Sequence, residues 1–190
     1  MQIEETGIPG LVVVTPRRFG DARGFFAETY NREKLAGHGI TTEFVQDNHS
    51  LSAQVGTVRG LHFQKPPRAQ VKLVRCGRGA LFDVAVDIRK GSPTYGRWFG
   101  VELSFENGKQ LLVPAGFAHG FVTRLPDTEI IYKCSDFYAP ETEGALRYDD
   151  PDIGIDWAMG DTAPILSDKD AAADAFAGFD SPFTYDVGPS

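Results

Sequence analysis

The sequence predicts an all-β protein, a barrel or sandwich of many short strands with short peripheral helices. Glycine and proline recur at short intervals, with 21 glycines and 12 prolines in 190 residues. The runs between them alternate with the two-residue period of strands. Helical patterns are confined to residues 31–36 and 168–176. Many short strands separated by turns are typical of closed or sandwiched sheets.

The clearest predicted strand covers residues 82–88, with large apolar side chains on one face. Further strands are predicted at residues 11–14, 71–76, 98–104, 110–113, 121–123 and 129–134. Asn31 is a candidate cap for the first helix, and Ser167 and Asp168 resemble a cap before the alanine-rich second one. No repeat or change of composition divides the chain, so we expect one domain over residues 1–190, with the segment from about residue 150 wrapping the barrel.

Composition limits the classes of partner. A hydrophobic content of 42% can supply a sizeable core. A net charge of -7 argues against nucleic acid as a partner, although a few arginines can still hold a diphosphate. No run approaches the roughly 18 apolar residues of a membrane helix, and the start lacks a signal pattern. Cys76 and Cys134 lie in apolar runs typical of reduced, buried thiols. We therefore expect a cytoplasmic protein that contacts no membrane.

Residues 112–119 are similar to the second signature of cupin barrels, in which a proline–glycine turn brings a histidine to the barrel mouth. The predicted fold is therefore a cupin-type jelly-roll barrel. Metal-binding cupins also carry two close histidines and a glutamate in an earlier strand, whereas residues 59–64 supply His62 alone. His38 or His49 would have to complete a three-histidine site. We predict no bound metal and no cofactor.

Several polar residues are predicted to face the barrel interior. Alternation puts Tyr132 on the face of Ile130, and Lys72 on the face of Val74. A buried ammonium group is costly without an anionic or oxygen-rich partner, and a ligand oxygen would serve. A tyrosine with a satisfied hydroxyl and a lysine whose ammonium group reaches solvent are the purely structural alternatives.

Arg59 and His62 can share one site only if their strand is irregular. Simple alternation puts them on opposite faces, and Gly60 is the natural position for a bulge between them. Taken alone, His62 is more simply interpreted as a hydrogen-bonded structural histidine, because a lone histidine is more often structural than catalytic.

Together these motifs resemble the dTDP-4-dehydrorhamnose 3,5-epimerase family over about residues 1–170. The resemblance is carried by residues 19–26 (FGDARGFF), 44–50 (FVQDNHS), 59–62 (RGLH), 72–76 (KLVRC), 82–89 (FDVAVDIR), 114–121, 132–133 and 137–144. Phe63 replaces a tyrosine often found after the histidine, and residues 158–190 are less similar. The resemblance implies a homodimer that acts on a dTDP-linked keto-deoxy sugar without a cofactor.

The resemblance also implies roles for individual residues. His62 is expected to be the base, Tyr132 the proton donor, Lys72 the group near the sugar carbonyl, and Asp170 the carboxylate that orients His62. The expected substrate contacts are Arg23, Glu28, Gln46, Asn48, Arg59, Lys72, His119, Tyr138, Glu143 and Lys169.

These residue types suit inversion next to a ketone. The reaction needs a base, a group that stabilises the enolate oxygen, and a donor on the opposite face. Imidazole titrates near neutral pH, whereas a tyrosine hydroxyl stays protonated there. The expected reaction is epimerisation of dTDP-4-dehydro-6-deoxy-D-glucose at carbons 3 and 5 to dTDP-4-dehydro-L-rhamnose. The alternatives are a single-carbon epimerase, a 3,4-ketoisomerase, a metal-dependent cupin oxygenase and a non-catalytic sugar-binding jelly roll.

Overall fold

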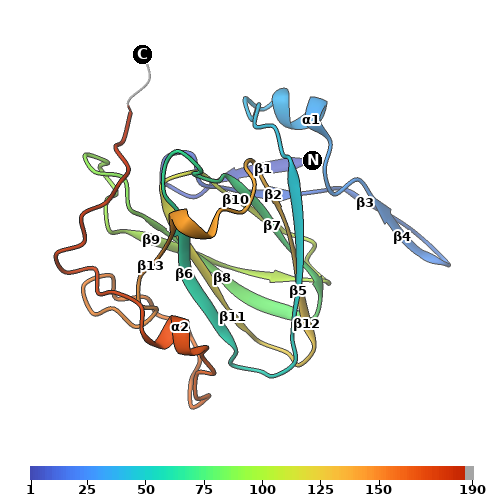
Figure 1. The fold of residues 1–190 in the computed structure, drawn as a ribbon. Coiled ribbons are helices and arrows are strands. Elements are labelled where there is room, and N and C mark those ends of the chain that lie inside the picture. The colour runs from blue at the N-terminus through green and yellow to red at the C-terminus, as the bar shows by residue number, and fades with distance from the viewer. Residues whose placement is uncertain (187–190) are drawn as a thin grey trace.

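Two antiparallel sheets face each other across the core of the protein (Figure 1). The structure is a computed structural model and describes residues 1–186. In spatial order, the six-stranded sheet contains β1 (Gln2–Glu5), β2 (Val12–Thr15), β10 (Gln110–Val113), β7 (Lys72–Arg78), β12 (Thr128–Cys134) and β5 (Gln46–Ser52). The five-stranded sheet contains β13 (Glu143–Ala145), β6 (Val58–Gln64), β11 (Phe117–Thr123), β8 (Ala80–Asp87) and β9 (Trp98–Ser104). Many neighbouring strands in each sheet are distant in sequence, as in a jelly roll. The predicted cupin-type jelly roll is confirmed.

The helices are short, as predicted. The first, α1 (Arg32–Ala36), begins at Asn31, whose side chain accepts a hydrogen bond from Lys34 N at 3.0 Å. A single 3-10 turn, η1, covers Pro140–Thr142. The predicted helix at 168–176 is too long, because α2 covers only Asp168–Ala171. Beyond it the chain straightens, and Asp174 O accepts a hydrogen bond from Arg147 N at 2.9 Å.

Apolar side chains pack on both sides of the five-stranded sheet. Inside the barrel, Leu81 and Ala85 of β8 meet Val74 of β7. On the outer face, Val84 and Val86 pack against the C-terminal segment, in a cluster that includes Ile153, Trp157 and Phe183. Figure 1 shows this orange-to-red segment beside β6 and β13. Among the described residues, no helix is long and apolar enough to cross a membrane.

A bulge interrupts the pairing of β6 with β11, as predicted from Gly60. His119 pairs with His62 and Phe121 pairs with Arg59, so two residues of β6 oppose one residue of β11. Gly60 has a φ of 128°, and a Cβ atom there would lie 2.5 Å from Gly120 Cα. Only glycine combines this conformation with so close an approach. The bulge lets Arg59 and His62 line the same cavity.

A separate hairpin formed by β3 (Arg18–Asp21) and β4 (Gly24–Ala27) projects away from the barrel (Figure 1). Its strands pair only with each other among the described residues. The side chains of Phe19, Phe25 and Phe26 are exposed on it. A two-stranded hairpin has little stability of its own, so this one needs support from further contacts.

Candidate active site

The barrel encloses a cavity of about 480 Å³ between its two sheets. Three structural units supply its walls: β6 and β11 of one sheet, β5, β7 and β12 of the other, and the C-terminal segment. The lining residues are Ser50, Thr57, Val58, Arg59, His62, Lys72, His119, Phe121, Ile130, Tyr132, Ile165, Leu166, Ser167, Lys169 and Asp170. This volume and the mixture of apolar walls with a few converging polar groups are typical of small-molecule sites.

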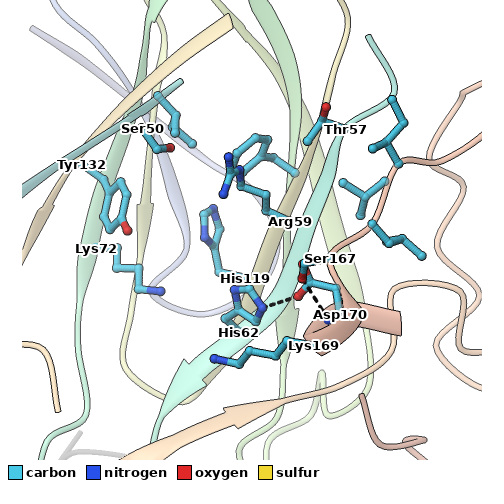
Figure 2. Close-up of a pocket in the computed structure, with 15 residues that line it drawn as sticks. Ser50, Thr57, Arg59, His62, Lys72, His119, Tyr132, Ser167, Lys169 and Asp170 are labelled. Atoms are coloured by element: carbon cyan, nitrogen blue, oxygen red, sulfur yellow. Dashed lines mark hydrogen bonds and ion pairs between the residues drawn. The ribbon is translucent and has the colours of Figure 1, made fainter. Parts of the chain in front are cut away.

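His62 forms a short polar contact with Asp170 in the cavity. Its Nε2 lies 2.5 Å from Asp170 Oδ1, and Ser167 Oγ donates to Asp170 Oδ2 at 2.8 Å (Figure 2). Burial lowers the pKa of His62, and the Asp170 carboxylate opposes that shift. His62 is therefore a neutral imidazole at pH 7, held in one orientation by a carboxylate that can stabilise its protonated form.

The segment that carries Asp170 is fixed to the barrel by backbone hydrogen bonds. Val58 N donates to Ile165 O at 2.9 Å, and Ile165 N donates to Gly56 O at 2.8 Å. Ser167 then caps α2 by accepting from Asp170 N at 3.1 Å. The sequence pattern identified Ser167 only as a helix cap, and the structure adds its bond to the Asp170 carboxylate three residues later.

Tyr132 and Lys72 lie across the cavity from His62. They belong to β12 and β7 of the six-stranded sheet, and Figure 2 shows both reaching into the space that His62 enters from β6. The Lys72 Nζ atom is 5.9 Å from the centroid of the Tyr132 ring. Burial raises the pKa of Tyr132 and lowers that of Lys72. The predicted inward orientation of both side chains is confirmed.

His119 and Arg59 also line the cavity. His119 Nε2 lies 2.9 Å from Asp83 Oδ1, and both side chains are almost fully buried. The Arg59 guanidinium donates to Ser52 Oγ at 3.2 Å and to Leu51 O at 3.3 Å, and Figure 2 shows it directed toward the cavity. Sequence reasoning did not single out Asp83, although a carboxylate on a predicted core strand was the signal that could have found it.

Four further predicted contacts lie beside the cavity and do not line it. Tyr138 N donates to Gln46 Oε1 at 2.9 Å, and Gln46 Nε2 donates to Asn48 Oδ1 at 3.0 Å. Glu143 on β13 instead pairs with Lys169, with 2.6 Å between Oε2 and Nζ. Lys169 does line the cavity, so this ion pair lies at its edge.

Arg23 and Glu28 are not brought into this cavity by their own chain. Arg23 lies at the tip of the β3–β4 hairpin, where its side chain is 90% exposed and pairs with Asp21. Glu28 pairs with Lys34 near the base of the hairpin. Their expected role as substrate contacts therefore lacks support within a single chain.

The remaining histidines are apart from the cavity. His49 faces Glu129 at 3.2 Å, and His38 follows α1 in an exposed loop. Among residues 1–186, no three His, Cys, Asp or Glu side chains form a group suited to holding a metal ion. Cys76 and Cys134 are buried free thiols, as predicted.

Fold and cavity together define an acid–base site in a cupin-type jelly roll. A base with its carboxylate lies on one wall, and a protonated phenol and an amine lie on the other. That arrangement suits proton removal from one face of a carbon acid and proton return to the other.

Comparison with known proteins identifies the family. A sequence model described as dTDP-4-dehydrorhamnose 3,5-epimerase matches residues 5–178, and this chain belongs to that family. The dTDP-4-dehydrorhamnose 3,5-epimerase of Sinorhizobium fredii is 51% identical over 185 residues, covering 97% of this chain and 94% of that protein.

Two solved structures extend the similarity to the fold. The Legionella pneumophila dTDP-6-deoxy-D-glucose-3,5-epimerase in complex with dTDP-4-keto-L-rhamnose has a TM-score of 0.92 and 45% identity, covering 98% of this chain and 99% of that one. The Bacillus anthracis dTDP-4-dehydrorhamnose 3,5-epimerase with TDP and PPi bound has a TM-score of 0.89 and 47% identity, covering 92% and 99%.

Proposed function

We propose that this protein epimerises dTDP-4-dehydro-6-deoxy-D-glucose at carbons 3 and 5, giving dTDP-4-dehydro-L-rhamnose. One observation carries the proposal: the His62–Asp170 pair faces Tyr132 and Lys72 across a single cavity. Membership of the epimerase family and the sugar nucleotide bound to the Legionella relative support it.

In the proposed reaction, neutral His62 removes the proton from the carbon next to the 4-keto group. The electron pair moves onto the carbonyl oxygen, and the Lys72 ammonium stabilises the enolate. Tyr132 then donates its proton to the opposite face of the same carbon, which inverts the centre. Asp170 stabilises the imidazolium until His62 returns its proton to solvent, and Tyr132 is reprotonated. The same keto group activates carbons 3 and 5, so one set of groups serves both inversions.

The remaining polar groups are proposed to hold the nucleotide. Arg59 and Lys169 are cations at the cavity and suit the diphosphate, because guanidinium and ammonium groups bind phosphate oxygens strongly. His119 is proposed to contact the sugar. Gln46 and Asn48 offer amide groups to the base, and the exposed Tyr138 ring offers a stacking surface.

The first experiment is proton NMR of dTDP-4-keto-6-deoxyglucose with the protein in heavy water. We expect deuterium at carbons 3 and 5 with the wild type, and a loss of about 100- to 10,000-fold in the rate with His62→Ala. His49→Ala removes an exposed histidine outside the cavity and should match the wild type. Deuterium at one carbon alone would indicate a single-carbon epimerase, and none would refute the proposed activity.

We further propose that the protein is a homodimer in which the β3–β4 hairpin contacts a second copy. Phe19 and Phe26 pair across the hairpin and are both exposed, whereas Phe25 faces Phe105; an exposed apolar pair on a projecting hairpin favours association. A hairpin that reaches the partner would bring Arg23 and Glu28 to the partner's cavity, which explains why they are distant from their own.

We also propose a cytoplasmic location, with which the free, buried thiols of Cys76 and Cys134 are consistent.

Mixing two inactive variants tests this shared site. If the dimer is two-fold symmetric, a mixed dimer of His62→Ala and Arg23→Ala chains has one site with neither defect. Random reassociation should then restore about a quarter of the wild-type activity. A monomer by light scattering, or no recovery in mixtures that demonstrably exchange subunits, would contradict the proposal.

A further inference from the structure

Asp83 is a carboxylate in the interior of the barrel with one oxygen unused. It lies in β8 on the same face as Leu81 and Ala85, which belong to the interior core, and its exposed fraction is 0%. Asp83 Oδ1 lies 2.9 Å from His119 Nε2, whereas Oδ2 is buried and has no hydrogen-bond partner among the described residues. Buried polar atoms are nearly always paired, so an unpaired carboxylate oxygen in an apolar core is costly and calls for an explanation.

The cation that needs a partner is Lys72. Its side chain enters the cavity from β7 and forms no hydrogen bond or salt bridge with any residue in the described part of the chain. Burial lowers its pKa, and the groups that oppose this shift are Cys134, Asp83 and Glu143. An amine that lost its proton could not stabilise an enolate oxygen, so one of these groups has to supply a negative charge.

Two of the three groups cannot supply that charge freely. Burial raises the pKa of the Cys134 thiol, so Cys134 is neutral near pH 7. The Glu143 carboxylate is paired with Lys169 at 2.6 Å, and that pair lies at the edge of the cavity. Asp83 alone combines full burial with a free oxygen, and Coulomb interactions in an apolar interior extend beyond contact distance.

We propose that Asp83 is a positioning residue that keeps Lys72 in its ammonium form and fixes the orientation of His119. A carboxylate can only accept, so His119 Nε2 carries the proton in this pair. The ring is thereby held with its other nitrogen available to the cavity. Asp83 touches no substrate in this account and acts through the two side chains that do. The inference rests on the proposed epimerase function.

Asp83→Asn tests the proposal because it removes the charge at nearly constant volume. We expect kcat to fall by at least about 10-fold while KM changes by less than about 3-fold, since the lost interaction matters most when the enolate forms. The basic limb of the kcat profile should move to lower pH, because the pKa of Lys72 falls when the Asp83 charge is gone. The other titratable groups near Lys72 are Tyr132, Cys134, His62 and Glu143. Lys72→Arg, which does not titrate, identifies the limb that belongs to Lys72.

A double-mutant cycle separates this role from a structural one. In a Lys72→Met background, Asp83→Asn should cause little further loss of kcat, because both changes remove the same interaction. Asp87→Asn is the matched control. Asp87 is also a fully buried carboxylate in β8, but it is fully bonded to Arg89, Ser92 and Thr94 away from the cavity. That control should lower Tm and leave kcat and the basic limb unchanged.

The proposal is overturned if Asp83→Asn behaves like Asp87→Asn, with a lower Tm, a wild-type kcat and an unmoved basic limb. If the amide variant does not fold, Asp83→Leu, which suits the apolar surroundings, is judged by the same criteria. A wild-type protein that incorporates no deuterium would instead refute the epimerase function itself, so the two failures are distinguishable.

Discussion

The bulge at Gly60 is the feature of the site whose energetic weight follows most directly from the structure. In Gly60→Ala the backbone would keep a φ of 128°, and the new methyl group would lie 2.5 Å from Gly120 Cα and 2.8 Å from His119 O. The backbone conformation costs a non-glycine residue about 1–3 kcal/mol. Overlap with a well-packed backbone costs about 1–3 kcal/mol more. We expect the free energy of unfolding to fall by about 2–6 kcal/mol, a large part of a typical total.

Denaturant unfolding checks this value, and Gly24→Ala is the matched control. Gly24 has a φ of 130°, but a Cβ atom there would meet nothing within 4 Å. The control therefore carries the backbone strain without the overlap, and the two variants should differ by about 1–3 kcal/mol. Equal losses, within about 0.5 kcal/mol, would refute the close contact between β6 and β11.

The same substitution should also reduce turnover in the fraction that remains folded. Relief of the overlap requires β6 to move away from β11, and His62 moves with it relative to Tyr132. A displacement of about 1 Å can reduce the rate by about 100-fold. Wild-type kcat in a folded Gly60→Ala protein would contradict the proposal that the bulge sets the position of the base.

The remaining predictions concern proton transfer. In Asp170→Asn, no charge opposes the effect of burial on His62, so the pKa of His62 falls further. The acid limb of the kcat/KM profile should therefore move to lower pH. The plateau of that profile should fall by about 100-fold, or about 2.7 kcal/mol. An acid limb that moves to higher pH would be evidence against the stabilising role of Asp170. In Tyr132→Phe, NMR in heavy water should show deuterium entering with retention of configuration, because His62 still exchanges its own proton. In Ser167→Ala, loss of the helix cap should lower the free energy of unfolding by about 1 kcal/mol, measured by thermal unfolding. We expect kcat to fall and KM to stay unchanged. A reduced kcat without any loss of stability would argue against the cap.

Sequence reasoning succeeded where alternation was undisturbed. The strand predicted at residues 82–88 is β8, and the face rich in large apolar residues packs under the C-terminal segment. It did not predict β5, because that edge strand is mostly polar and carries little hydrophobic alternation. It placed Arg59 and His62 in one strand but did not predict the bounds of β6, since the bulge at Gly60 breaks the period that would reveal them.

The candidate site was predictable only in part. Tyr132 and Lys72 followed from alternation, and Asp170 followed from resemblance. The contact of Asp170 with His62 needs the three-dimensional approach of α2 to β6, which local sequence does not encode. Arg23 and Glu28 lie on or near a hairpin that projects from the barrel. The pattern of one sequence cannot predict which surface of a second chain such a hairpin contacts.

The His62–Asp170 pair joins residues that are 108 positions apart in the chain. Nearly the whole barrel is therefore synthesised before the carboxylate that completes the pair exists. A chain that stops before Ile165 contains every strand of both sheets and the His62 imidazole, yet it lacks the Asp170 carboxylate. Under the proposed mechanism, the site is therefore complete only once Asp170 has been added, and a chain that ends earlier lacks the carboxylate partner of His62.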